Sequence, residues 1–145
     1  MDDPRLQQIV DEHEIAKLIV RIAQLADTGD LAEYGRCFTD DAEWHLPAAS
    51  AVGLPQQARR GLSDILSGAQ ERRDAGIQGP GTHTHHVPTT TMVDVTGDRA
   101  SSRSYFRYYV GLDAEPRLVT MGEYHDEFAR TPDGWRLRRR EIVHP

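Results

Sequence analysis

The stretch TTMVDVTGDRASSRSYFRYYVGL, residues 90–112, decides the fold. Two runs rich in β-branched and aromatic residues flank Thr96-Gly97-Asp98-Arg99, a sequence typical of a tight turn. The pattern continues with runs from Arg117 to Arg130 and from Trp135 to Val143, which follow the turn signals Asp113-Ala114-Glu115-Pro116 and Thr131-Pro132-Asp133-Gly134. Four strands joined by three turns predict an antiparallel meander.

The N-terminal half of the chain instead has the hydrophobic periodicity of helices. Apolar residues recur every three or four positions from Arg5 to Ala26, after Asp2, Asp3 and Pro4, which suit a helix start. The turn Asp27-Thr28-Gly29-Asp30 ends this helix, with a break also conceivable near Asp11 to His13. Further along we predict a helix from Leu31 to Phe38, a strand from Ala42 to Leu46, a helix from Gly61 to about Asp74 and a loop from Gly76 to Thr82.

Helices followed by a long meander are typical of an α+β fold. We expect the helices to cover the concave face of a curved antiparallel sheet and to leave a pocket between the two layers. At 145 residues the chain fits a single domain, residues 1–145, because a second core would need a longer chain.

Composition excludes several classes of partner. The net charge of -6 argues against nucleic acid, and the basic run from Arg136 to Arg140 is expected to be a solvated strand face. No segment has the apolar length of a membrane span, and the acidic N-terminus is unlike a signal peptide. The single cysteine, Cys37, excludes an internal disulfide and suits a reducing compartment. We therefore expect a cytoplasmic protein with no membrane partner.

Three histidines, His83, His85 and His86, stand just before the first strand of the meander. They could hold a metal, provide a base, or form a polar strand edge, because histidine titrates near neutrality and also ligates metals. His83 and His85 would share one face of a strand and His86 the other. No carboxylate follows within a few residues, so we expect no metal. His83 and His85 are expected to be polar loop residues.

The sequence lacks the motifs of phosphoryl and acyl transfer. It has no Gly-rich phosphate loop with a lysine and no Gly-x-Ser-x-Gly elbow. We expect no cofactor.

Several short motifs, in their order along the chain, resemble one family. They are Asp27-Thr28-Gly29-Asp30, Phe38-Thr39-Asp40-Asp41-Ala42-Glu43-Trp44, His86 before the first long strand, Gly97-Asp98-Arg99-Ala100 at its turn and Asp133-Gly134-Trp135 before the last. Together they resemble the SnoaL-like branch of the nuclear transport factor 2-like superfamily over nearly the whole chain. The resemblance implies a cone-shaped α+β fold around a deep apolar pocket, and a homodimer.

The resemblance also implies site residues. The closest functional pattern is that of scytalone dehydratase and hexachlorocyclohexane dehydrochlorinase, which hold an aspartate at the end of the first long helix near a histidine at the start of the first long strand. By position these are Asp27 and His86, which we predict to be catalytic. Scytalone dehydratase has a second histidine near the position of Tyr108, where this chain has none.

Four further residues are expected to bind substrate: Trp44, Tyr108, Glu123 and His125. Met121, Glu123, His125 and Glu127 share one face of their strand and Gly122, Tyr124, Asp126 and Phe128 the other, and alternation alone does not tell which face looks inward. From the residues alone, Asp27 could instead be a helix-end carboxylate, His86 a strand-edge histidine and Trp44 a core residue.

These residues predict a cofactor-independent lyase of the dehydratase type. An Asp27–His86 dyad would abstract a proton from a small apolar cyclic or polycyclic substrate, such as a polyketide. The same dyad would serve an isomerase or a polyketide cyclase. A non-catalytic ligand-binding or scaffold module, or an accessory subunit such as that of ring-hydroxylating dioxygenases, shares the same fold, so fold alone does not decide the function.

Overall fold

The first helix is long and continuous. The computed structural model describes residues 3–47 and 55–145, and in it α1 runs from Pro4–Thr28 without a break near Asp11. The Asp3 side chain caps the helix by accepting a hydrogen bond from the Arg5 amide at 2.9 Å, and Pro4 occupies the first turn. Its buried stripe of Ile15, Ile19 and Ile22 faces the sheet, as the apolar period predicts.

Short elements follow α1. They are α2 (Leu31–Gly35), β1 (Phe38–Leu46), β2 (Gln57–Arg60) and α3 (Leu62–Asp74). The helix predicted to reach Phe38 ends earlier, because Phe38 already pairs with Leu137 in the sheet. Strand β1 is correspondingly longer than the predicted Ala42–Leu46.

The meander is confirmed. It consists of β3 (His85–Thr96), β4 (Arg99–Val110), β5 (Arg117–Thr131) and β6 (Gly134–Val143), each antiparallel to the next. The sheet order is β2-β1-β6-β5-β4-β3, with β1 parallel to β6. Gly97 and Gly134 adopt φ angles of 61° and 108° at two of the turns, in the left-handed region that favours glycine.

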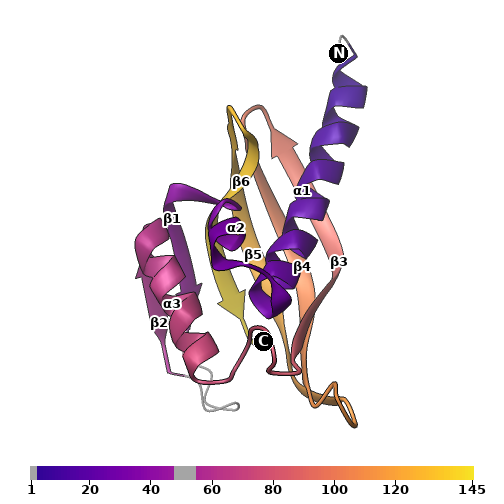
Figure 1. Ribbon diagram of the computed structural model, residues 1–145. Helices are drawn as coiled ribbons and strands as arrows, with labels where there is room; N and C mark the ends of the chain where they lie inside the picture. The colour runs from indigo at the N-terminus through magenta and orange to yellow at the C-terminus, as the bar shows by residue number, and fades with distance from the viewer. Residues whose placement is uncertain (1–2, 48–54) are drawn as a thin grey trace.

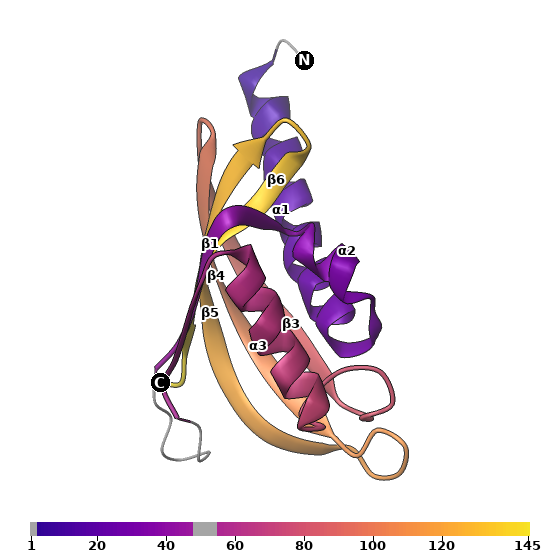
Figure 2. The ribbon, with the colours of Figure 1, turned by 60° about the vertical axis from the view of Figure 1, so that its left-hand side comes forward.

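The helices cover one face of the curved sheet. Figure 1 shows α1 crossing in front of β3 and β4, and α3 lying over β1 and β2 at the other edge. In Figure 2, where the sheet is seen nearly edge-on, all three helices lie on the same side of it. Phe128 and Leu137 are fully buried against this layer. The α+β fold predicted from the sequence is therefore correct, and the space between the two layers holds the core and the site.

In the part of the chain that the structure describes, no helix has the length and apolar character needed to cross a membrane.

Candidate active site

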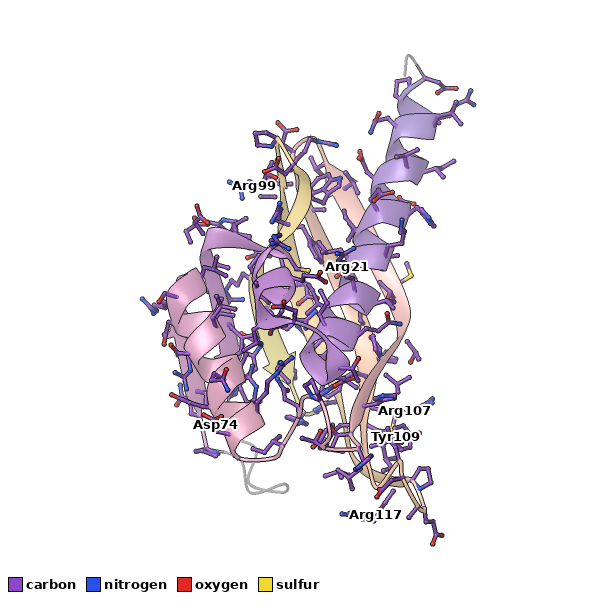
Figure 3. All side chains as sticks on the ribbon, in the orientation of Figure 1. Arg21, Asp74, Arg99, Arg107, Tyr109 and Arg117 are labelled. Carbon is purple, nitrogen blue, oxygen red and sulfur yellow. The ribbon has the colours of Figure 1, made fainter. Side chains whose placement is uncertain are left out.

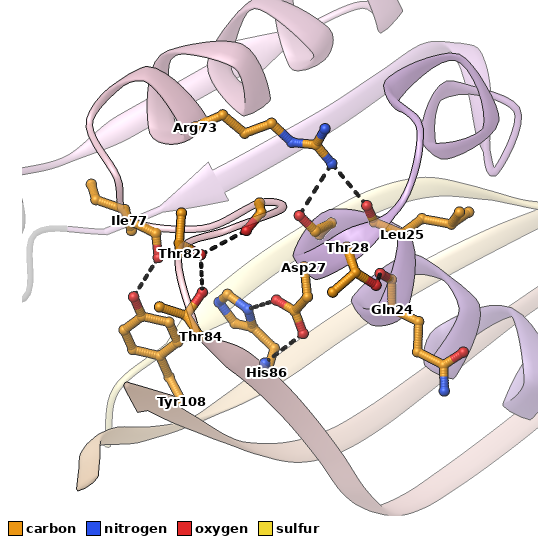
Figure 4. A network of polar contacts seen from close by, with 12 residues as sticks. Gln24, Leu25, Asp27, Thr28, Arg73, Ile77, Thr82, Thr84, His86 and Tyr108 are labelled. Carbon is orange, nitrogen blue, oxygen red and sulfur yellow. Dashed lines mark hydrogen bonds and ion pairs between the residues drawn. The ribbon is translucent and has the colours of Figure 1, made fainter. Parts of the chain in front are cut away.

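Asp27 and His86, which are 59 residues apart in the sequence, are in contact. Asp27 lies in the last turn of α1, and His86 is the second residue of β3. Asp27 Oδ2 accepts the backbone N–H of His86 at 2.8 Å, and Asp27 Oδ1 lies 2.7 Å from His86 Nδ1 (Figure 4). Two contacts to one carboxylate fix both the strand end and the imidazole ring relative to the helix.

The contacts determine which ring nitrogen carries the proton. Asp27 is almost completely buried, and its carboxylate already accepts the His86 amide, so it acts as an acceptor towards the ring as well. His86 Nδ1 therefore donates, and in the neutral ring Nε2 is left with a free lone pair. This is the arrangement that a general base requires.

Tyr108 lies against the other side of the imidazole. His86 and Tyr108 face each other across β3 and β4, and their ring centroids are 4.7 Å apart. The Tyr108 hydroxyl donates to the carbonyl of Ile77, in the loop before β3 (Figure 4). Burial raises the pKa of Tyr108 above its ordinary value. The neutral Tyr108 side chain is thus fixed in place beside the His86 ring.

Arg73 holds the end of α1 in place. Its Nη2 donates to the carbonyls of Leu25 at 2.9 Å and Gly29 at 2.8 Å, which flank Asp27 in sequence. Figure 4 shows this guanidinium above the end of α1, while the Asp27 side chain points towards His86. The Leu25 carbonyl also accepts the Gly29 amide, so the guanidinium adds a second donor at this helix end, where the helix dipole favours a positive charge.

A cavity of about 190 Å³ lies beside the dyad. His86 lines it, whereas Asp27 stands behind the imidazole and is not part of the lining. The wall is mostly apolar and comes from both layers; it includes Ile22, Ala26, Trp44, Leu46, Phe106, Tyr108, Tyr124 and Ile142. Trp44 and Tyr108 therefore lie where the sequence analysis expected substrate-binding residues. An apolar cavity with few polar groups is the usual form of a small-molecule site.

A buried ion pair forms one side of the cavity. Arg140 donates through Nε and Nη2 to the two carboxylate oxygens of Asp126, at 2.8 and 2.9 Å. Burial opposes the positive charge, but the attraction and hydrogen bonds of Asp126 outweigh it and raise the pKa of Arg140. The guanidinium lies 3.8 Å from the centroid of Tyr124, which stacks on Phe106 at 4.3 Å. The pair is neutral overall and positions these aromatic rings.

Glu123 and His125 do not line the cavity, contrary to the expectation that they bind substrate. They lie on the outer face of β5, where His125 Nε2 is 3.0 Å from Glu123 Oε1. The inward face carries Gly122, Tyr124, Asp126 and Phe128, all of which are buried. The physical reason is that Tyr124 and Phe128, on the inward face, fill the core with bulky aromatic rings, whereas Glu123 and His125 are polar and cannot do so.

His83 and His85 lie away from the cavity. Both are exposed, and His83 Nε2 is 3.9 Å from Asp113 on a neighbouring loop. Among residues 3–47 and 55–145, no three side chains of histidine, cysteine, aspartate or glutamate gather in a way that would hold a metal ion.

Sequence reasoning missed several polar residues of the cavity, among them Arg72, Gln78 and Arg140. Arg140 belongs to the basic run that was expected to face solvent. A bulge in the pairing of β5 with β6 inserts one residue between Leu137 and Arg139, and this turns Arg140 inward. Arg72 lies near the end of α3 and Gln78 in the loop that follows it. At these positions no hydrophobic periodicity indicates which side chains point inward.

These observations define a class of protein, namely an α+β cone with a carboxylate–histidine pair at its cavity. Residues 7–141 match the family model described as a SnoaL-like domain. The Mycobacterium tuberculosis protein Rv2910c is 31% identical over 136 residues, which cover 92% of this chain and 84% of that protein. The chain therefore belongs to the SnoaL-like family of the nuclear transport factor 2-like superfamily.

Solved structures share this fold. An NTF2-like protein with a cystatin-like fold from Novosphingobium aromaticivorans has a TM-score of 0.80 at 27% identity, covering 98% of this chain and 90% of that one. ActVI-ORFA from Streptomyces coelicolor has a TM-score of 0.72 at 22% identity, covering 92% and 96%. A proposed scytalone dehydratase from N. aromaticivorans has a TM-score of 0.70 at 20% identity, covering 93% and 84%. At these last two identities the likeness is one of fold.

Proposed function

We propose that the protein is a cofactor-independent lyase of the dehydratase type, acting on a small cyclic substrate. The observation that carries this proposal is the double contact between Asp27 and His86 at the wall of a mostly apolar cavity. The likeness of the fold to a proposed scytalone dehydratase supports the same reaction class. The size of the cavity suits such a substrate, since about 190 Å³ exceeds the roughly 150 Å³ of an apolar cavity that takes up benzene.

The reaction can be written with the residues present. His86 Nε2 takes a proton from a carbon next to a carbonyl group, and the electron pair of that C–H bond forms the new double bond as the C–O bond to a hydroxyl on the neighbouring carbon breaks. The imidazolium then gives its proton to the departing oxygen, so that water leaves and His86 returns to its neutral form. Asp27 stabilises the transient imidazolium and keeps its ring in place.

Turnover assays on paired variants test this function. Cyclic β-hydroxyketones of one or two rings are incubated with the wild type, and the loss of water is followed by ultraviolet absorbance and mass spectrometry. The change of His86→Gln should lower turnover by about 10²–10⁴-fold, the range of general base catalysis. The change of His85→Gln, one residue away but exposed, is the matched control and should leave turnover unchanged.

Each other outcome has a definite meaning. A product with the double bond moved, or with a new ring, would assign an isomerase or a cyclase using the same dyad. Undiminished turnover in His86→Gln would refute the role of the histidine. Tight ligand binding without turnover on any substrate would assign a non-catalytic binding module. The homodimer expected from the resemblance is tested separately by light scattering of the purified protein.

A further inference from the structure

Arg72 brings to the cavity a positive charge that has no ion-pair partner among the described residues. It lines the cavity from the last turns of α3, and its guanidinium carbon lies 4.7 Å from the ring centroid of Trp44. None of the ion pairs formed among the described residues includes Arg72; the nearby carboxylates of Asp64 and Glu71 pair with Arg59 instead. Burial lowers the pKa of Arg72 from its ordinary value, which reflects how poorly its charge is solvated.

The other charged groups at the cavity are already paired. Arg140 is neutralised by Asp126, and the Asp27 carboxylate is occupied by His86. A cation–π contact with Trp44 offsets only part of the cost of partly burying the Arg72 guanidinium. Arg72 is only partly exposed and forms no ion pair with a described residue, and a partly desolvated cation of this kind attracts an anionic ligand.

Gln78 is an independent second observation at the same cavity. Its side chain is only 4% exposed and lines the cavity from the loop between α3 and β3. Its Nε2 is buried and has no hydrogen-bond partner among the described residues. Buried amide donors are nearly always bonded in folded proteins, so an unpartnered one at a cavity wall suits an oxygen of a bound ligand.

We infer that the ligand of this cavity is a carboxylate of a one- or two-ring compound, with its anionic group bound by Arg72 and Gln78 and its rings against the aromatic wall. This inference deepens the proposed function and rests on it for the reaction, though not for the binding. A planar carboxylate matches the donor geometry of a guanidinium and offers a further oxygen to the Gln78 amide. Trp44, Phe106 and Tyr124 provide the apolar surface for the rings.

Binding of matched acid and amide pairs tests the inference without any need for turnover. The probes are 2-naphthoate and 2-naphthamide, and benzoate and benzamide. They are titrated into the wild-type protein by calorimetry, with Trp fluorescence as a second readout. The two members of a pair have nearly the same shape, so the difference between their affinities measures the contribution of the negative charge. We expect each carboxylate to bind at least about 10-fold more tightly than its amide, as for a charge-assisted bidentate pair.

The variants assign this preference to named residues. Arg72→Gln should abolish the preference, and Gln78→Leu should weaken acid binding by about 3–10-fold. Arg107→Gln is the matched control, because Arg107 is exposed on β4 near one end of the sheet and is not part of the cavity (Figure 3). Circular dichroism of each variant verifies that the fold is retained.

Equal affinity for acid and amide, no binding of either acid at millimolar concentration, or a preference that survives Arg72→Gln would overturn the inference. The His86→Gln variant tests carboxylate binding independently of the proposed lyase activity. A His86→Gln protein that keeps the acid preference but has lost turnover supports both. Acid preference in a wild type that turns over no substrate upholds the inference while the proposed lyase activity fails.

Discussion

The contact between Asp11 and Arg130 should determine part of the acid stability of the protein. Arg130 donates to both Asp11 oxygens, at 2.9 and 2.8 Å, and Trp135 Nε1 donates to Oδ1 at 3.0 Å. These bonds join the N-terminal half of α1 to β5 and β6, far along the helix from Asp27. The hydrogen bonds from Arg130, with those from Trp135 and Gln7, outweigh burial and lower the pKa of Asp11 from 3.8 to about 2.

The sign and size of the effect follow from this pKa. Because the folded-state pKa lies below the unfolded one, the ionised carboxylate stabilises the folded state above about pH 4, and this stability is lost as the pH falls towards 2. Each pKa unit corresponds to roughly 1.4 kcal/mol, and the one-third exposure of Arg130 weakens the pair, so Asp11→Asn should cost about 1–2 kcal/mol at pH 7. At pH 3 roughly half of that difference should remain.

Urea unfolding followed by circular dichroism at pH 7 and pH 3 measures this effect. Asp94→Asn is the matched control, because Asp94 is exposed on β3 and forms no ion pair with the described residues. The reasoning is refuted if Asp11→Asn and Asp94→Asn unfold alike at pH 7. It is equally refuted if the cost of Asp11→Asn is the same at both pH values.

Three further changes should have definite results. In Gly122→Ala the new Cβ would lie 2.6 Å from Phe106 Cε1, so a loss of about 2 kcal/mol in urea unfolding and weaker ligand binding are expected. Arg73→Ala should raise amide hydrogen exchange at the end of α1 and lower turnover about 10-fold, whereas unchanged exchange would contradict its positioning role. Burial raises the pKa of Cys37, so iodoacetamide should label it only on unfolding; rapid labelling of folded protein would contradict this.

The meander could be predicted because its signals are local. Gly97 and the turn chemistry around it mark strand ends, and the long β-branched and aromatic runs suit no other element. The Asp27–His86 contact was also expected, although 59 residues separate the partners; no local period predicts such a contact, and it came from the family resemblance.

The inward faces of β5 and β6 could not be predicted from alternation alone. Alternation gives two sets of residues but not which one meets the helices, so the sequence left open whether Glu123 and His125 face the cavity, and the structure has them on the outer face. On β6 the bulge near Arg138 shifts the alternation by one residue, which brings Arg140 into the core beside Asp126. A bulge depends on pairing with the neighbouring strand, so a single strand carries no clear sign of it.

The elements before the meander show the same limit. Strand β2 has only four residues and depends on β1 for its pairing, so its own sequence did not predict it. Gln78 lies in a loop, and its local sequence gives no sign that it is buried. The polar residues that give the cavity its charge thus come from places where tertiary packing rather than local sequence decides the structure.

The tautomer of His86 is the most direct test of the proposed base. Long-range ¹⁵N–¹H correlation spectra of the histidine rings at about pH 8 distinguish Nδ1–H from Nε2–H, with the His86 signals assigned from His86→Gln. The account predicts that His86 is the Nδ1–H tautomer in the wild type, and that Asp27→Asn increases its Nε2–H population. A wild-type His86 in the Nε2–H form would leave no free lone pair on Nε2 to act as a base and would contradict the dyad.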